Sequence, residues 1–343
     1  MISRREALEL FRSDDLIGIG MEADAVRRRR HPEGIVSYII DRNINYTNFC
    51  TEYCTFCAFY RPMGHAEGYV LPQEQIFEKI RETIELGGTG VLMQGGLHPD
   101  LKIEWYEDLF RAIKQRFPIH LHCLSAPEVA NIAEVSGLSL RDAIIRLRDA
   151  GLDSIPGGGA EILDDDVRRR ISRLKCSTGE WTGVHRTAHQ LGMRTTATMM
   201  FGCGETIEQR MNHLEIVRDI QEETGGFTAF IPWTFQRENT SLGRSVHEEA
   251  TAVEYLQTLA ISRIYLANIE NLQASWVTQG LKTCQLALRF GANDVGSIMI
   301  EENVVSAAGV HHRATEEELR RIIRDAGFVP KQRDTLYRTY FLN

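Results

Sequence analysis

The sequence lacks any long apolar run. Hydrophobic residues make up 43% of its 343 residues, but apolar stretches such as 197–201 are far shorter than the ~18 residues of a membrane-spanning helix. Residues 1–15 are charged and amphipathic, unlike a secretion signal. We therefore expect a cytoplasmic protein with no membrane partner.

The sequence also has fewer basic than acidic residues. The chain has 39 Lys and Arg residues against 47 Asp and Glu residues, which gives a net charge of −8. Such a chain is not suited to coat the phosphates of a nucleic acid, so we expect no nucleic-acid partner. The basic run at 27–30 is interpreted as the solvated end of a helix.

Cysteine is too sparse for a disulfide framework. The chain has seven cysteines, an odd number, and four of them are scattered. Of these four, Cys203 stands between two glycines, and we interpret it as a free buried thiol. The other three lie within eight residues, at 50, 54 and 57. This clustering is the first non-random feature of the sequence.

The fold is predicted from the alternation of short apolar runs with helical patterns, which indicates parallel strands joined by crossover helices. Eight such units over ~260 residues fit an α/β fold of the (β/α)8 TIM-barrel type. Strands are expected at 36–44, 90–94, 119–124, 152–155, 193–201, 227–231, 271–275 and 294–298. A doubly wound open sheet is the alternative, but no Gly-x-Gly-x-x-Gly follows the first strand.

Three parts of the chain are expected. Residues 1–33 form a helical extension, residues 34–310 form the barrel, and residues 311–343 form an extension that packs on it. In such barrels the chemistry gathers where strands end and loops begin. Cys50, Gln94 and Pro156 each follow a predicted strand, and so we expect the active site at that face.

The motif Cys50-Thr-Glu-Tyr-Cys54-Thr-Phe-Cys57 predicts a metal centre. A structural zinc site normally takes four ligands, so zinc would need His31, His65 or a distant cysteine as well. Three thiolates on a four-iron cube leave one iron open, which is typical of catalytic sites. A non-catalytic module that binds zinc or an iron–sulfur cluster remains the alternative.

The spacing of these cysteines, with an aromatic residue before the last, resembles the signature of the radical S-adenosylmethionine (SAM) superfamily. The resemblance implies a [4Fe-4S] cluster on Cys50, Cys54 and Cys57 whose open iron binds SAM. It also implies that Phe56 supports the cluster and adenine and that Phe59 offers backbone groups to the adenine. For both aromatic residues, a plain core position is the alternative.

Two further elements of the superfamily are present in altered form. The family often has Gly-Gly-Glu after the second strand, whereas this chain has Gln94-Gly95-Gly96-Leu97. Gln94 is the expected substitute for the missing glutamate toward the SAM amino group. The second element is Gly-x-Ile-x-Gly-x-x-Glu on the fifth strand, which Thr198-x-Met200-x-Gly202-x-x-Glu205 matches loosely. Met200 in it is expected against the adenine, although a core methionine is the alternative.

A glycine-rich loop, Pro156-Gly-Gly-Gly-Ala-Glu161, lets the backbone approach a ligand closely. We expect Gly158 in contact with the cofactor and Glu161 on ribose hydroxyls of SAM or of the substrate. A surface or helix-capping acid is the other interpretation of Glu161.

Over residues 5–338 the sequence is similar to a narrower group within the superfamily. These stretches resemble the cyclic dehypoxanthinyl futalosine synthase family of the futalosine route to menaquinone: 41–48, 57–61, 94–100, 156–161, 195–202, 227–236, 273–279 and 299–304. The family implies an enzyme whose deoxyadenosyl radical removes hydrogen from C4′ of a nucleoside-type substrate. The carbon radical then attacks a carboxyphenyl ring, and SAM is consumed. Aminofutalosine synthase and FO synthase are the related alternatives.

Several residues are candidates for binding that substrate and for removing its last proton. The expected substrate contacts are His122, Ser125, Trp233, Arg237 and Trp276, with His120 as a further candidate. The catalytic base is expected among His122, Asp294 and Glu302, and also Glu301. An external one-electron donor such as flavodoxin or ferredoxin is the expected protein partner.

Overall fold

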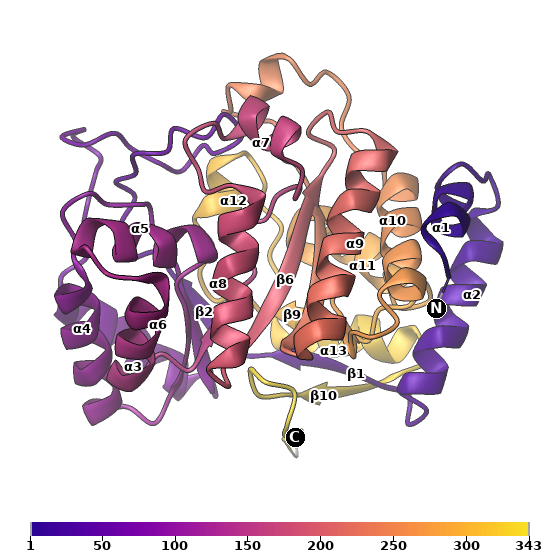
Figure 1. Cartoon of the computed structure of the whole chain (residues 1–343). Helices are drawn as coiled ribbons and strands as arrows, with labels where there is room; N and C mark the ends of the chain where they lie inside the picture. The colour runs from indigo at the N-terminus through magenta and orange to yellow at the C-terminus, as the bar shows by residue number, and fades with distance from the viewer. Residues whose placement is uncertain (1, 342–343) are drawn as a thin grey trace.

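A computed structural model of the chain describes residues 2–341. The predicted terminal extensions include Met1 and residues 342–343, which lie outside the described residues. Figure 1 shows strands enclosed by helices, with the two-helix N-terminal segment at one side and the C-terminus below the barrel. No helix within residues 2–341 is long and apolar enough to cross a membrane.

Seven parallel strands form the main sheet in the order β2-β3-β4-β5-β6-β7-β8. Their bounds are β2 Asp41–Ile44, β3 Gly90–Met93, β4 His120–Cys123, β5 Ser154–Ile155, β6 Arg194–Phe201, β7 Phe227–Thr234 and β8 Asn271–Leu272. A second parallel sheet has the order β10-β1-β9. It contains β1 Ile35–Ile39, β9 Asp294–Ser297 and β10 Val329–Gln332.

The two sheets close into a barrel because β9 bridges them. It pairs with β1, and the N–H of Ala274, just after β8, donates to the carbonyl of Asp294 at 2.9 Å. The predicted (β/α)8 class is thus confirmed, with β9 in the eighth position. The expected strand 36–44 is divided at Ile40, because β1 pairs with β9 and β10 whereas β2 pairs with β3.

Helices between the strands cover the outer face of the barrel. They are α3 Gln73–Glu85, α4 Ile103–Arg116, α5 Ala126–Ser136, α6 Leu140–Ala150, α7 Asp165–Ile171, α8 Thr178–Gln190, α9 Ile207–Thr224, α10 Ala252–Tyr265 and α11 Trp276–Ala287. The short α12 Val304–Ala307 instead lines the interior cavity, and a 3-10 turn spans Leu242–Arg244. Capping boxes begin α8 at Ser177 and α9 at Thr206, because each hydroxyl accepts a backbone N–H from the first turn.

The ends of the chain add to this barrel. Helices α1 (Arg4–Phe11) and α2 (Leu16–Arg30) pack against α9 and α10. Helix α13 (Glu316–Asp325) leads to β10, which extends the sheet beside β1. The residues after β10 turn back under the barrel, so that Arg333, Thr335 and Tyr337 line its interior cavity from below.

Candidate functional site

The three clustered cysteines lie in the loop after β2. Cys50, Cys54 and Cys57 line one cavity of about 220 Å³. Seven of the residues predicted to bind the cofactor also line it, namely Phe56, Phe59, Gln94, Gly95, Gly96, Gly158 and Glu161. So do Ser125 and Trp233, which were predicted to contact the substrate, together with Glu128 and Lys175. The barrel therefore brings the ends of several strands to the cysteine loop.

Arg61 holds the cysteine loop in shape. Its guanidinium Nη1 donates to the carbonyls of Ala58, Phe59 and Tyr60 at 3.0–3.3 Å. Its own carbonyl accepts the N–H of Cys50 at 3.1 Å. These hydrogen bonds close the loop across the cysteines, so that the loop is ordered by the protein itself.

Gly96 allows the loop after β3 to touch the cysteine loop. A Cβ added at Gly96 would lie 2.2 Å from the carbonyl oxygen of Phe49 and 2.8 Å from the Cβ of Cys50. Any side chain there would push the two loops apart. Gly96 is thus required for the close approach of the two loops.

Glu128 is a buried residue that the sequence did not single out. Its carboxylate accepts the N–H of Gly95 at 2.9 Å, the Tyr46 hydroxyl at 2.8 Å and the Ser125 hydroxyl at 2.6 Å. Burial raises the pKa of Glu128, although these hydrogen bonds oppose that shift. Ser125 caps α5 through this contact, and Glu128 fixes the loop in which the family's usual glutamate is absent.

Glu161 is buried at the other side of the same cavity. Its Oε1 accepts a hydrogen bond from Lys175 Nζ at 2.9 Å, whereas its Oε2 has no hydrogen-bond partner and lies 3.7 Å from Nη1 of the buried Arg168. Burial by itself lowers the pKa of Lys175, but the charges of Glu161 and Cys54 outweigh it and raise that pKa. Glu161 also has a positive φ of 41°, a conformation that non-glycine residues rarely adopt. An orphaned acceptor held in this way is suited to bind hydroxyl or amino donors of a ligand.

The donors around this cavity fit an iron–sulfur cluster with SAM. Burial raises the pKa of the Cys50 and Cys54 thiols, so that these thiolates require nearby positive charge, which iron supplies and Lys175 supports. Within residues 2–341 no three His, Cys, Asp or Glu side chains converge on a point that suits a single metal ion. The cysteines instead surround a shared space.

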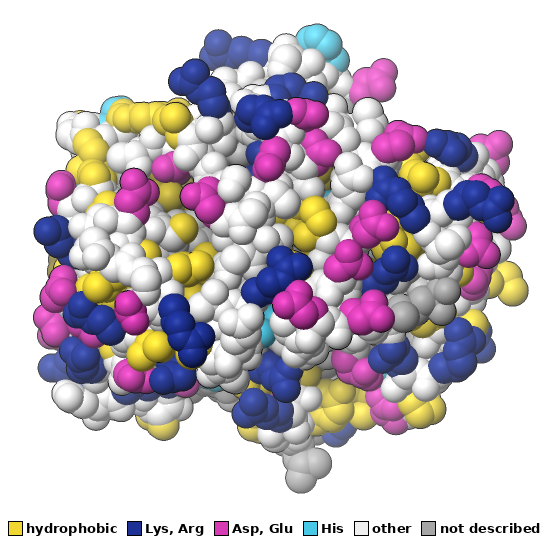
Figure 2. Space-filling view, in the orientation of Figure 1, with side chains coloured by type: hydrophobic (Ala, Val, Ile, Leu, Met, Phe, Trp, Pro, Cys, Tyr) yellow, Lys and Arg dark blue, Asp and Glu magenta, His cyan; other side chains and the backbone are white. Residues whose placement is uncertain are grey.

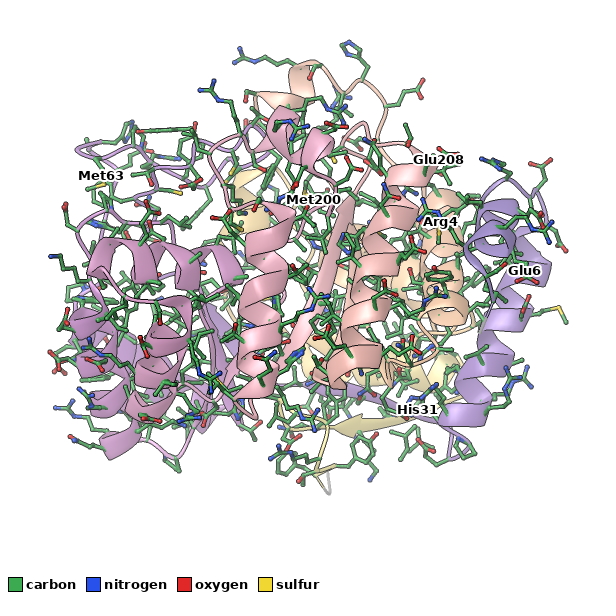
Figure 3. All side chains as sticks on the ribbon, in the orientation of Figure 1. Arg4, Glu6, His31, Met63, Met200 and Glu208 are labelled. Carbon is green, nitrogen blue, oxygen red and sulfur yellow. The ribbon has the colours of Figure 1, made fainter. Side chains whose placement is uncertain are left out.

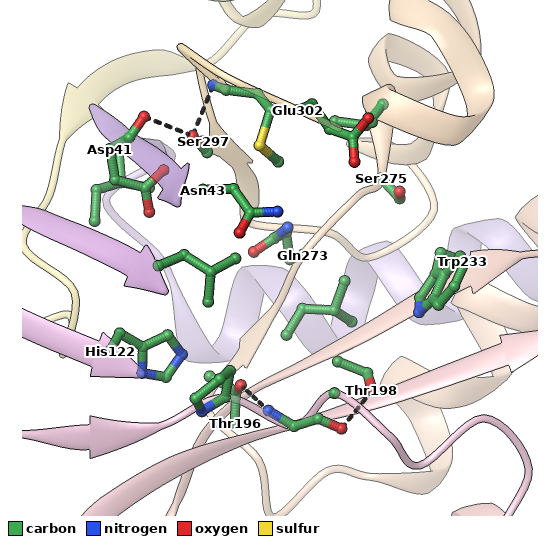
Figure 4. Close-up of a pocket in the computed structure, with 18 of the residues that line it drawn as sticks. Asp41, Asn43, His122, Thr196, Thr198, Trp233, Gln273, Ser275, Ser297 and Glu302 are labelled. Carbon is green, nitrogen blue, oxygen red and sulfur yellow. Dashed lines mark hydrogen bonds between the residues drawn. The ribbon is translucent and has the colours of Figure 1, made fainter. Parts of the chain in front are cut away.

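A second cavity, of about 310 Å³, fills the barrel interior. It meets the cysteine-lined cavity at Gln94, Gly158, Trp233 and Val304, which line both. Figure 4 shows Asn43 and Gln273 pointing toward one another across this space. The glycine loop forms part of its wall, because Thr196 accepts the Gly157 N–H at 2.9 Å and Thr198 donates to the Gly157 carbonyl at 2.7 Å.

His122 lines the interior cavity as a neutral side chain. Its Nδ1 and the Nε2 of His120 each lie 2.7 Å from the hydroxyl of Ser154. Burial lowers the pKa of His122 to about 3, and the neighbouring His120 adds to that shift. His122 is therefore suited to exchange hydrogen bonds with a substrate rather than to become charged.

Two carboxylates lie at or near the floor of this cavity: Asp41 lines it, whereas Asp294 does not. Asp294 is saturated, because it accepts hydrogen bonds from Arg333, Ser37 and the backbone of Gly296. Asp41, which the sequence did not single out, faces the cavity. Burial raises the pKa of Asp41 to about 6, although Ser297 and Arg333 oppose the shift.

The remaining predicted residues divide into two groups. Trp233 and Trp276 line the interior cavity, and Trp276 Nε1 donates to the Ser297 carbonyl at 2.9 Å. Glu302 also lines it, but its carboxylate accepts three backbone N–H groups from residues 304–306. Met200 (Figure 3) is buried in the hydrophobic core and reaches the site through its N–H, which donates to the Glu161 carbonyl.

The expectation for Arg237 requires a correction. Its guanidinium donates to the carbonyls of His247 and Gly243 in a surface loop, and it lines neither of the two joined cavities. The strand before it, β7, continues to Thr234, which carries Arg237 beyond the barrel mouth. Glu301 likewise lines neither cavity and pairs instead with Lys79 at 2.7 Å.

Comparisons with known proteins agree with this geometry. The Radical SAM superfamily model matches residues 44–217, and the CofH/MqnC C-terminal region matches residues 224–342. The cyclic dehypoxanthine futalosine synthase of Halalkalibacterium halodurans is 50% identical over 337 residues, which cover 98% of this chain and 90% of that protein. The 5-amino-6-(D-ribitylamino)uracil--L-tyrosine 4-hydroxyphenyl transferase of Methanothermobacter thermautotrophicus is 45% identical over 345 residues, covering 98% of this chain and 94% of that protein.

Solved structures share the fold. The crystal structure of methylornithine synthase (PylB) aligns with a TM-score of 0.73 at 19% identity, over 96% of this chain and 94% of that one. At this identity the likeness speaks for the fold alone. The family matches go further: the chain belongs to the radical SAM superfamily, whose members use a [4Fe-4S] cluster and SAM, and within it to the group that includes cyclic dehypoxanthine futalosine synthase.

Proposed function

We propose that this enzyme converts dehypoxanthinyl futalosine into cyclic dehypoxanthinyl futalosine in menaquinone biosynthesis. One observation carries the proposal: the cysteine-lined cavity opens, past Gln94 and Gly158, into an interior cavity of about 310 Å³ with both polar and aromatic walls. A nucleoside-type substrate with an aromatic ring needs such a chamber next to SAM. The 50% identical relative of that name supports the choice.

A bound cluster and SAM supply a 5′-deoxyadenosyl radical. In the proposed reaction the ribose C4′ loses a hydrogen atom to that radical, and 5′-deoxyadenosine is formed. The C4′ radical bonds to the carboxyphenyl ring, and aromaticity is restored when the ring loses one proton to a base and one electron to a one-electron acceptor. The protein holds the reacting atoms close together and excludes water from them.

On the SAM side, the roles follow from the contacts around the cysteine-lined cavity. Glu161, with Oε1 bound by Lys175 and Oε2 without a hydrogen bond, accepts hydrogen bonds from ribose hydroxyls. Gln94 and the backbone of Gly95 and Gly96 face the amino acid part of SAM. Glu128 acts on this contact indirectly, because it fixes the N–H of Gly95.

On the substrate side, Trp233 and Trp276 offer aromatic surfaces and neutral His122 offers hydrogen bonds, whereas Ser125 lines the cysteine-lined cavity and donates its hydroxyl to Glu128. For the final proton we propose Asp41 in place of the candidates from the sequence. Asp294 is saturated by its partners, Glu302 caps α12 and His122 is a weak base. Asp41 faces the cavity with a pKa of about 6, near the range in which general bases work best.

Anaerobic turnover of the reconstituted protein tests this function. The protein is incubated with SAM, dithionite and dehypoxanthinyl futalosine, and the products are analysed by mass spectrometry. We expect a product two hydrogens lighter than the substrate, in equal amount to 5′-deoxyadenosine, and neither with Cys54→Ala. An adenosyl adduct would instead indicate radical addition, and 5′-deoxyadenosine with unchanged substrate would exclude this substrate.

The 45% identical transferase makes one parallel assay necessary. Tyrosine and 5-amino-6-(D-ribitylamino)uracil are supplied under the same conditions in place of dehypoxanthinyl futalosine. The proposal expects no coupled product from that pair. If a coupled product forms and dehypoxanthinyl futalosine stays unconverted, the enzyme has the transferase activity instead.

A further inference from the structure

The surface beside the cysteine loop is formed by two segments that meet at Thr55. Thr55 lies between Cys54 and Cys57, and its N–H donates to the carbonyl of Ile171 at 2.8 Å. Its own carbonyl accepts the N–H of Leu242 at 2.8 Å and the hydroxyl of Ser241 at 3.1 Å. The end of α7 and the 3-10 turn after β7 thus border the protein's cysteine loop directly.

This surface carries exposed arginines without acidic partners. Arg170 and Arg173 lie on the first segment and Arg244 on the second, and all three are exposed. None of the three forms an ion pair with any other residue in 2–341. The neighbouring Arg169 differs, because it pairs with Asp166. Figure 2 shows basic side chains gathered at the top of the molecule, above α7, although the chain as a whole has a net charge of −8.

Apolar side chains are exposed on the same surface. Tyr53, next to Cys54, is 47% exposed, and Leu174, next to Lys175, is 53% exposed. Tyr53 also has a positive φ of 48°, so the loop presents this ring to solvent at the cost of backbone strain. Exposed apolar side chains beside basic ones are typical of a protein-binding surface rather than of a solvated one.

Some of the acidic residues near this surface have partners within the protein, and others do not. Asp165 and Asp166 lie in the first turn of α7, and Glu180 caps α8 through Ser177. Glu52, in the cysteine loop, is half-buried, and its Oε2 lacks a hydrogen-bond partner. Glu248 and Glu249 are exposed four and five residues beyond Arg244. Glu238 and Glu249 line the same hollow as Arg244 and offset part of its charge, so the basic charge beside Thr55 rests mainly on Arg170 and Arg173.

We propose that Tyr53, Leu174, Arg170, Arg173 and Arg244, here called the donor face, dock a small acidic electron-carrier protein. The carrier loses one electron and the [4Fe-4S] cluster gains it, with no bond made or broken. Complementary charge brings such a partner to a surface quickly and in the right orientation. The proposal rests on the cluster that the family uses and is independent of which substrate the enzyme takes.

Reduction kinetics with two electron donors test the donor face. A flavodoxin of acidic charge, reduced to its hydroquinone, is mixed with the reconstituted enzyme, and flavin oxidation is followed by stopped flow. We expect Arg173→Glu/Arg244→Glu to slow this reaction about tenfold or more at low ionic strength. Reduction by dithionite, which needs no docking, should be unchanged.

The matched control is Arg29→Glu. Arg29 is exposed, forms no ion pair within the described residues and lies on α2, near His31 at the lower edge of the molecule (Figure 3). Its charge change of −2 is matched by each of the single donor-face variants Arg173→Glu and Arg244→Glu, each of which we expect to slow the reaction by itself. Its reduction by flavodoxin should match that of the wild type. An equal effect of the control and the donor-face variant would overturn the proposal, because net charge alone would then explain both.

Two further readouts keep the test decisive. The affinity of the oxidised enzyme for flavodoxin, measured by biolayer interferometry without turnover, should fall in the donor-face variant. The wild-type reduction rate should also fall steeply as salt is added, because screening weakens the attraction between exposed charges. A wild-type rate independent of salt, or unaltered affinity in the variant, would place electron delivery elsewhere. Failure of cyclisation alone would leave these results unaffected.

Discussion

The guanidinium of Arg333 binds both carboxylate oxygens of Asp294, with Nε to Oδ2 at 2.6 Å and Nη2 to Oδ1 at 3.0 Å. Both residues are buried, and they lie 39 positions apart, one at the start of β9 and the other just after β10. The pair therefore ties the C-terminal segment to the floor of the barrel, directly below the interior cavity.

Arg333→Met should destabilise the protein, because Asp294 would be left as a buried charge without its partner. Breaking one side of a buried pair costs about 3–5 kcal/mol. Urea unfolding of the apoprotein measures the loss. The double variant Asp294→Asn/Arg333→Met should recover part of the stability, since no isolated charge remains. Equal stability of the wild type and Arg333→Met would contradict the inferred role of the pair.

Gly96→Ala should prevent cluster assembly. The new Cβ would lie 2.2 Å from the Phe49 carbonyl, and backbone at this position has little freedom to move. We expect lower iron content and loss of the brown absorption near ~400 nm of thiolate-ligated iron. Gly183→Ala in α8 is the matched control, because its Cβ would meet nothing closer than 3.9 Å. Full iron content in Gly96→Ala would show that the two loops can separate without harm.

Glu161→Gln should weaken SAM binding. The amide removes the charge of a buried acceptor and one of its oxygens, and hydrogen bonds to charged groups contribute about 1.5–3 kcal/mol, which is roughly ten- to hundredfold in Kd. Calorimetric titration of SAM into the reconstituted enzyme measures this. Lys175→Met should have a similar effect, because Lys175 holds Glu161 in place. Unchanged SAM affinity in both variants would remove Glu161 from the site.

Much of the site was predictable where its residues share a short stretch of chain. The cysteine spacing, the glycine pair at 95–96 and the loop at 156–161 each carry a local pattern, and all lie around one cavity. The barrel was predictable because the hydrophobic pattern of each strand and helix is also local in the chain. The division of strand 36–44 was not, since only the partner strands determine it.

The residues that the sequence analysis did not identify reach the cavity through contacts between segments that are far apart in the chain. Lys175 reaches the cavity from the loop between α7 and α8, and Glu128 reaches it from α5. No sequence motif marks either residue. Asp41 is notable only because β2 turns it toward the barrel interior. Arg237 shows the opposite error, because proximity to a strand end in sequence did not place it at the cavity.

Acid should unfold the protein at a higher pH than the titration of its carboxylates alone would predict. Burial lowers the pKa of His213 to about 3, whereas an unfolded histidine titrates near 6.5. Between these values the unfolded chain binds a proton that the folded chain does not, so stability falls as the pH falls below 6.5. At pH 5 this amounts to about 2 kcal/mol for His213. His213→Asn, which keeps an acceptor for the Leu163 N–H, should show a smaller slope of unfolding free energy against pH.

Asp41→Asn should uncouple cyclisation from SAM cleavage. Hydrogen abstraction does not use Asp41, so 5′-deoxyadenosine should still form, but the amide cannot take the final proton. Loss of a general base lowers turnover roughly a hundredfold or more. In the wild type, cyclised product per 5′-deoxyadenosine should fall as the pH drops through about 6, because Asp41 is then protonated.

The pH profile distinguishes this role from a merely structural one. Asp41→Asn should lose the inflection near pH 6 and keep its low coupling at every pH, with unchanged iron content. Glu302→Gln is the matched control, because Glu302 lines the same cavity but caps α12, and its coupling should remain near one. If Asp41→Asn instead yields one cyclised product per 5′-deoxyadenosine at the wild-type rate, the proton leaves by another group, and His122 becomes the next acceptor to test.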